Sequence, residues 1–115
     1  MTVESLELLQ GTLDLLVLRT LAWQPMHGYG ISQWIRGRTG DVLLVQDAAL
    51  YQALRRLERK GWVDAEWATT ENNRRARVYR LTAVGRGQLE SELSAWNRYA
   101  EAVSRVLAPI PGEAS

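Results

Sequence analysis

The sequence predicts a mainly α-helical α+β fold, with three short helices, a small β-hairpin and a long C-terminal helix. Three observations predict it. Apolar residues recur at helical spacing in three early segments. They then alternate with polar residues on either side of an Asn-rich segment, and near the C-terminus they recur at heptad-like spacing. The chain has 115 residues, 46% of them hydrophobic, which suits one domain with a modest core.

The first two helices are predicted from apolar residues at helical spacing on either side of a turn. The turn is expected over residues 24–28, because Pro25 and Gly28 together interrupt a helical pattern. Tyr29, just after the turn, is expected to pack between helices. The predicted helices span residues 12–23 and about 28–37, and the buried stripe of the second is Ile31, Trp34 and Ile35.

The third helix is predicted to begin at Asp47, whose carboxylate can accept hydrogen bonds from the free amides of the first turn. Gly61 is expected to end it. At about 100° per residue, the helix has two faces of opposite character. The apolar face carries Leu50, Ala53, Leu54 and Leu57, and the polar, basic face carries Ala48, Gln52, Arg55, Arg56 and Arg59.

Two alternating runs between Trp62 and Leu81 flank a polar tip at residues 70–74 and predict a hairpin whose returning strand is basic. Thr82 is expected to cap a helix that reaches about Leu107. A helix of about 26 residues is roughly 39 Å long, more than a core of this size can cover. Part of its seam therefore needs a partner. The seam residues are Leu89, Leu93, Trp96, Ala100, Val103 and Leu107.

Charge is unevenly distributed along a chain whose net charge is +1. Basic and acidic residues number 3 and 4 in residues 1–45, 9 and 5 in 46–87, and 2 and 4 in 88–115. A basic middle segment fits either a solvated face or a surface for a polyanion. Together with three helices followed by a hairpin, it favours a winged helix-turn-helix whose third helix enters a DNA major groove.

The residues predicted to contact DNA lie on the third helix and the hairpin. Gln52 and Arg55 have the reach and the donors for base edges or phosphates, whereas Arg74 suits phosphate or minor-groove contacts. The predicted set is Ala48, Tyr51, Gln52, Arg55, Arg56, Arg59, Arg74, Arg75 and Arg77.

Catalysis, cofactors and metals are not expected. The chain has no Cys, no Gly-rich phosphate loop and no metal-ligand spacing, and its one His, His27, is expected to make a structural hydrogen bond where the second helix starts. The first ten residues lack the features of a secretory signal, and the longest apolar run, residues 15–18, is too short to span a bilayer. A cytoplasmic protein with no membrane partner is expected.

Four motifs resemble, in order, the signatures of PadR-like transcriptional regulators. They begin at Leu9, His27, Leu50 and Tyr79 and read LQGTL, HGYGI, LYQALRRLERKG and YRLTAVG. Four motifs in the right order, covering residues 9 to about 90, make the resemblance specific. Residues 45–49 read VQDAA and lack the Ser-Pro turn and the hydroxyl usual in the family. No hydroxyl is therefore available there for a phosphate contact.

The resemblance implies a winged-helix repressor that binds double-stranded DNA at an inverted repeat as a homodimer. It predicts a DNA-binding domain at residues 1–81, a dimerisation helix at 82–108 packed with the first helix, and a tail at 109–115. Some members of the family bind aromatic or cationic molecules between the C-terminal helices, so Trp96 is either a dimer contact or part of a site for an unidentified effector. The predicted dimerisation residues are Leu9, Leu13, Leu89, Leu93, Trp96, Ala100, Val103 and Leu107.

The alternative function is a winged-helix protein-interaction module that does not bind DNA. The missing Ser-Pro turn and the near-zero net charge favour it, whereas Arg55, Arg56 and the arginine-rich hairpin argue against it.

Overall fold

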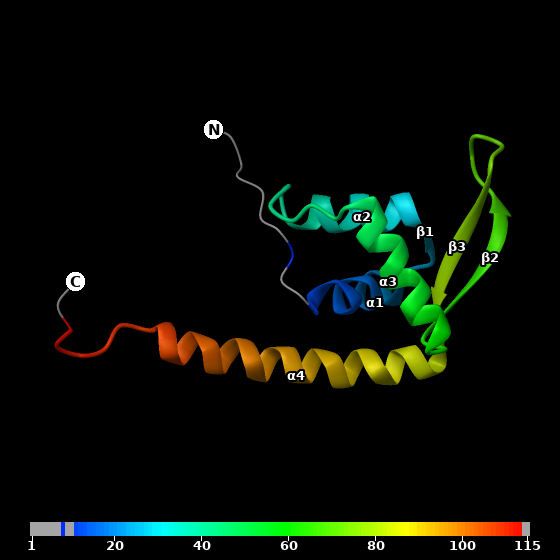
Figure 1. The fold of residues 1–115 in the computed structure, drawn as a ribbon. Coiled ribbons are helices and arrows are strands. Elements are labelled where there is room, and N and C mark those ends of the chain that lie inside the picture. Colours follow the sequence, from blue (N-terminus) through cyan, green and yellow to red (C-terminus); the bar gives the residue numbers. More distant parts are fainter. Residues whose placement is uncertain (1–7, 9–10, 114–115) are drawn as a thin grey trace.

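The computed structural model describes residue 8 and residues 11–113. This part of the chain forms four helices and a three-stranded antiparallel sheet, which confirms the predicted α+β fold (Figure 1). None of these helices is long and apolar enough to cross a membrane. The elements are α1 (Thr12–Trp23), β1 (Met26–His27), α2 (Gly28–Arg38), α3 (Asp47–Arg59), β2 (Val63–Thr69), β3 (Arg75–Leu81) and α4 (Ala83–Leu107).

The turn predicted at residues 24–28 contains a short strand, β1, that the sequence analysis missed. Met26 and His27 pair with Tyr79 and Val78, so β3 is the central strand in the order β1-β3-β2. Two residues are too few to show an alternating pattern, and they are extended because they pair with a strand about 50 residues away in sequence. β1 therefore joins the start of α2 to the hairpin.

Side chains cap two of the helices as predicted. His27 Nδ1 accepts a hydrogen bond from the amide three residues later at 3.0 Å, and Thr82 Oγ1 does the same at 3.0 Å at the start of α4. Asp47 begins α3 as predicted. Gln46 is the N-cap residue of α3 and makes no side-chain capping bond, while Asp47 is the first helical residue, where its charge favours the helix dipole.

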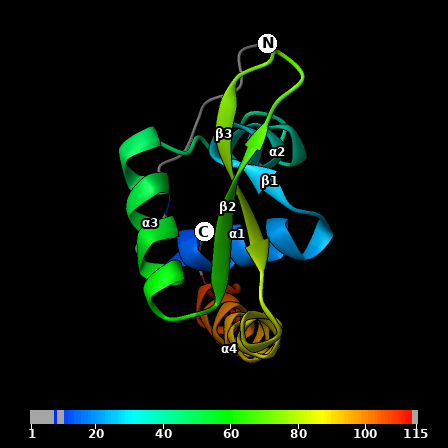
Figure 2. The ribbon, with the colours of Figure 1, turned by 90° about the vertical axis from the view of Figure 1, so that its right-hand side faces the viewer.

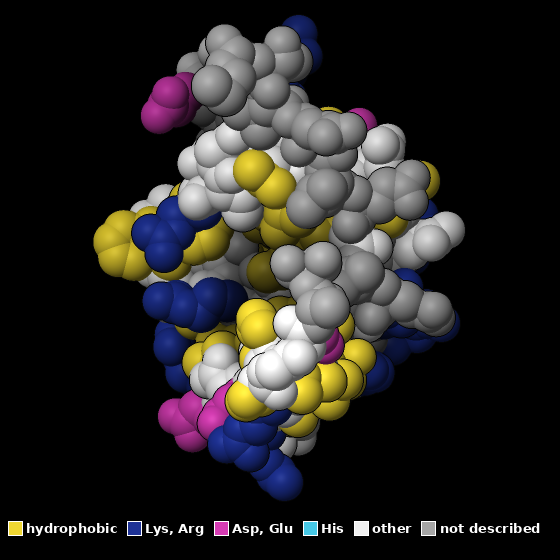
Figure 3. All heavy atoms as spheres, turned by 90° about the vertical axis from the view of Figure 1, so that its left-hand side faces the viewer, with side chains coloured by type: hydrophobic (Ala, Val, Ile, Leu, Met, Phe, Trp, Pro, Cys, Tyr) yellow, Lys and Arg dark blue, Asp and Glu magenta, His cyan; other side chains and the backbone are white. Residues whose placement is uncertain are grey.

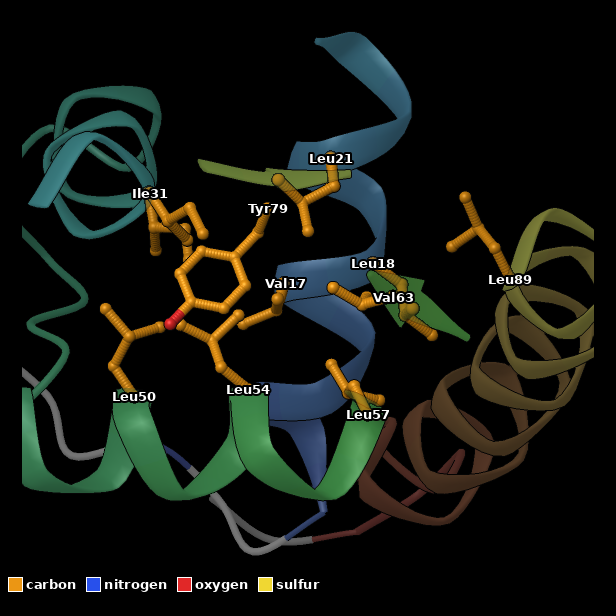
Figure 4. Packing of buried hydrophobic residues seen from close by; sticks show 11 residues of the cluster. Val17, Leu18, Leu21, Ile31, Leu50, Leu54, Leu57, Val63, Tyr79 and Leu89 are labelled. Atoms are coloured by element: carbon orange, nitrogen blue, oxygen red, sulfur yellow. The ribbon is translucent and has the colours of Figure 1, made fainter. Parts of the chain in front are cut away.

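The core lies where α1, α2 and α3 meet the sheet. Figure 4 shows the Tyr79 ring of β3 between Ile31 of α2 and Leu50 of α3, with Leu89 reaching toward the cluster from α4. Burial raises the pKa of the Tyr79 phenol. All four residues predicted for the apolar face of α3 are buried, whereas Trp34 of α2 is only half-buried. The opposite face of α3 is consequently left on the surface.

The long helix α4 packs against α1 and then continues past the rest of the molecule (Figure 1). Of its seam residues Leu89 is buried, but Leu93, Trp96 and Val103 are 39%, 37% and 37% exposed and Leu107 is 77% exposed. A single chain therefore leaves the C-terminal part of the apolar seam without cover.

The junction between the hairpin and α4 requires glycine at position 85. The carbonyl oxygen of Trp62 accepts a hydrogen bond from the Thr82 amide at 3.0 Å, which holds this oxygen against the first turn of α4. A Cβ at Gly85 would overlap the Trp62 carbonyl oxygen and would lie 2.8 Å from the side chain of Leu81. The two segments can approach this closely only because position 85 has no side chain.

We expect Gly85→Ala to lower the free energy of unfolding by about 2 to 3 kcal/mol, because the added methyl group has no room. The control is Gly87→Ala in the next turn, where a Cβ would meet nothing within 4 Å. That substitution should raise the free energy of unfolding by up to about 1 kcal/mol, since Ala favours a helix more than Gly does. Urea unfolding of both variants measures the difference, and equal effects would contradict this account.

Candidate nucleic-acid interface

An open groove of about 940 Å³ separates the hairpin from α3 and from the start of α2. Figure 2 shows α3 on one side and the upper half of the hairpin on the other, with α2 behind them. The groove has basic, aromatic and polar walls. Its lining includes Tyr29, Tyr51, Arg55, Trp67, Arg74 and Arg75.

Five of the nine predicted DNA-contacting residues line this groove, namely Tyr51 and Arg55 of α3 and Arg74, Arg75 and Arg77 of the hairpin. The six on α3 are all exposed, because the buried leucines of the same helix face the core. On the hairpin, Arg74 and Arg75 are exposed at the tip, whereas Arg77 is half-buried further along β3. The structure thus brings together side chains that are about 20 residues apart in sequence. The six on α3 are Ala48, Tyr51, Gln52, Arg55, Arg56 and Arg59.

Two of the predicted arginines are bound to carboxylates. Arg56 donates through Nη2 to Asp14 Oδ1 of α1 at 2.8 Å, and this contact raises the pKa of Arg56 above its ordinary value. Arg77 donates from Nη1 and Nη2 to the two oxygens of Glu58 at 3.3 and 3.1 Å, which ties the hairpin to α3. Among the described residues, Arg55, Arg74 and Arg75 form no ion pair.

Two aromatic residues of the groove were not predicted as part of the site. Tyr29 is 67% exposed rather than packed between helices, and its ring centroid lies 6.4 Å from that of His27, while the ring of Tyr51 occupies the space beside Gly28. A Cβ at Gly28 would lie only 2.7 Å from the Tyr51 hydroxyl oxygen. Trp67 is 59% exposed, and the Arg75 guanidinium lies 5.3 Å from its ring centroid.

The position of Trp67 could have been inferred from the strand period. Trp67 is four residues after the buried Val63 and therefore shares its face of β2. The core ends before Trp67, so the side chain lies over the groove instead. An apolar residue on the inner face of a hairpin, beyond the last core contact, is the signal that was missed.

The fold and the groove define a class. A helix with an exposed basic face, preceded by two helices and followed by a basic hairpin, is the DNA-binding arrangement of winged helix-turn-helix proteins. Among the described residues, no group of His, Asp and Glu could hold a metal ion.

Comparison with known proteins identifies the family. Residues 17–91 match the model of the "Transcriptional regulator PadR-like family". The chain therefore belongs to the PadR-like family of transcriptional regulators, as its motifs had suggested. An uncharacterised protein of Lysinibacillus sphaericus is 29% identical over 97 residues, which cover 84% of this chain and 89% of that protein.

Solved structures agree with this family. A transcriptional regulator from Clostridium thermocellum superposes with a TM-score of 0.79 at 25% identity, over 86% of this chain and 93% of that one. A PadR family transcriptional regulator from Eggerthella lenta has a TM-score of 0.75 at 27% identity, over 88% of this chain and 86% of that one.

The side chain of His27 caps the start of α2 beside the groove, and removing this capping bond should lower the stability of the fold. We expect His27→Ala to lower the free energy of unfolding by about 1 kcal/mol, because the amide of Gly30 loses its acceptor. Gln46→Ala is the matched control, since the N-cap side chain of α3 makes no such bond and its loss should change stability by less than about 0.5 kcal/mol. Thermal unfolding of both variants checks this, and a larger effect at Gln46 would contradict it.

Proposed function

We propose that the chain is a sequence-specific DNA-binding regulator that acts as a homodimeric repressor in the cytoplasm. The observation that carries this proposal is the groove, because its two walls bear exposed arginines that form no ion pair with any residue the structure describes. The major groove of B-DNA admits an α-helix, so α3 is proposed to read base edges there while the hairpin contacts the adjoining backbone or minor groove. Family membership supports the same assignment.

The exposed face of α3 and the hairpin are proposed to supply different kinds of contact. Gln52 and Arg55 of α3 are assigned to base edges, since Gln and Arg can pair with adenine and guanine through two hydrogen bonds. Arg74 and Arg75 are assigned to phosphates, which supply affinity rather than sequence choice. Tyr29 and Trp67, which also line the groove, are proposed to pack against the sugar-phosphate chain that lies between α3 and the hairpin. The remaining proposed contacts on α3 are Ala48, Tyr51 and Arg59.

The uncovered seam of α4 supports the homodimer. Figure 3 views the molecule from the side on which α4 ends, and there exposed hydrophobic side chains gather beside basic ones. A second copy related by a two-fold axis would cover Leu93, Trp96 and Val103 with the same residues of its own. Leu13 of α1 is half-buried against the core, and Leu9 lies outside the described residues.

The dimer has consequences for the operator and for an effector. Two copies related by a two-fold axis would present their α3 helices to an inverted repeat whose half-sites are about 34 to 36 Å apart, and occupancy of a promoter would block transcription. The Trp96 ring centroid lies 6.3 Å from that of Tyr99. A flat aromatic molecule could stack on this pair, but packing against the partner helix is the simpler role.

The DNA-binding assignment is tested by Arg55→Ala. We expect a loss of about tenfold or more in affinity for labelled DNA from the region upstream of the protein's own gene, and a shallower dependence of affinity on salt. Arg98→Ala, an exposed arginine on α4 away from the groove, should change neither. Fluorescence anisotropy at several salt concentrations gives both quantities. Wild-type protein that binds no DNA even at low salt would contradict the proposal and favour the protein-interaction module.

The dimer is tested by a charge on the seam. We expect Val103→Glu to weaken self-association by at least about tenfold, because two carboxylates would face each other in an apolar interface. The control is Val106→Glu, since Val106 is 81% exposed and lies off the seam. Sedimentation velocity across a concentration series separates the two variants. A wild-type monomer at high micromolar concentration, or equal effects of the two substitutions, would contradict the dimer.

A further inference from the structure

Arg55 and Arg56 are neighbours on the exposed face of α3, but they point to different parts of the molecule. Arg55 lines the groove between α3 and the hairpin, and Arg56 does not. Successive residues of a helix point about 100° apart. The side chain of Arg56 accordingly reaches α1, where it meets Asp14 in the first turn of that helix.

The contact between Arg56 and Asp14 has the geometry of a two-point link. Nη2 donates to Oδ1 at 2.8 Å, and Nε lies 3.5 Å from Oδ2. The two side chains are 44% and 25% exposed, so water screens the pair only in part. A planar guanidinium that meets a carboxylate at two points sets a direction as well as a distance.

A link of this kind matters because of what α1 contacts. α1 packs against both α3 and α4. The apolar contacts between α1 and α3 determine which face of α3 is buried, but hydrophobic attraction is non-directional and does not by itself fix the exact rotation of the helix about its axis. The ion pair lies beside these contacts and resists such a rotation, which would swing Gln52 and Arg55 away from their targets.

We propose that Arg56 is a positioning residue, which with Asp14 holds α3 at the correct rotation on α1, and that it does not itself contact DNA. This inference rests on the proposed function, because its effect is measured through DNA binding. It divides the arginines of α3 by role: Arg55 binds the nucleic acid, and Arg56 orients the helix that carries Arg55.

The decisive variant is Asp14→Asn. If Arg56 were a DNA contact restrained by Asp14, neutralising the carboxylate would free a cation and strengthen binding. If Arg56 positions α3, both Asp14→Asn and Arg56→Gln should weaken binding three- to tenfold. The salt dependence should then keep its wild-type slope in both variants, since no phosphate contact is lost. Arg55→Gln is the comparison, and its salt slope should fall by about one.

The double variant Asp14→Asn/Arg56→Gln adds a second readout. Two residues that act only through each other are not additive, so the double variant should bind DNA no more weakly than the weaker single variant. Circular dichroism at the assay temperature confirms that each protein is folded. The proposal is overturned if Asp14→Asn strengthens binding or if Arg56→Gln lowers the salt slope as much as Arg55→Gln. Wild-type protein that binds no DNA would overturn the proposed function as well, which separates the two failures.

Discussion

The packing of one face of α3 against α1 and the sheet decides what the rest of the surface can do. Leu50, Leu54 and Leu57 are almost fully buried, and each contributes roughly 1.5 to 3 kcal/mol to folding through the burial of apolar surface. Because these three residues occupy a single stripe, they determine which way the helix faces. The polar and basic residues between them are displayed outward as a consequence, and the groove exists only because this face stays uncovered.

The central strand β3 places the other wall of the groove. It pairs with β1 through two residues and with β2 along its whole length, so one strand joins the start of α2 to the hairpin. Tyr79 on this strand fills the core between α2 and α3 (Figure 4). The same strand carries Arg77, whose bond to Glu58 ties the hairpin to the end of α3. Core packing and the shape of the groove therefore depend on the same seven residues of β3.

Local patterns were enough to predict most of the elements. The period of α3 identified its buried face, Thr82 and His27 were recognised as helix starts, and the alternating runs located the hairpin to within about two residues. These features are local because each depends on residues within four positions of one another. The start of α3 was also predicted, since Asp47 is its first helical residue, but the sequence did not show that the N-cap residue before it, Gln46, makes no side-chain capping bond.

What the sequence did not predict depends on contacts between distant residues. β1 is a strand because it pairs with β3, and the space beside Gly28 is filled by Tyr51, which lies 23 positions later on α3. The partner of Arg56 is 42 residues away, and that of Arg77 is 19 residues away. The sequence gives no way to rank the nine predicted DNA contacts, and only the fold shows that, among the described residues, Arg56 and Arg77 are paired with carboxylates whereas Arg55, Arg74 and Arg75 are not.

The position of α1 between α3 and α4 gives the proposed dimer a physical route to the proposed DNA-reading face. In a dimer held by the seam of α4, a change in the angle between the two long helices would carry α1 with it, because α1 packs along α4. α3 would follow through its buried leucines and through Arg56 and Asp14. The half-site spacing depends on where two such α3 helices lie. An effector bound near Trp96 would therefore alter DNA affinity only so far as it favours one crossing angle over another. A molecule that binds both arrangements equally would leave transcription unchanged, however tightly it binds.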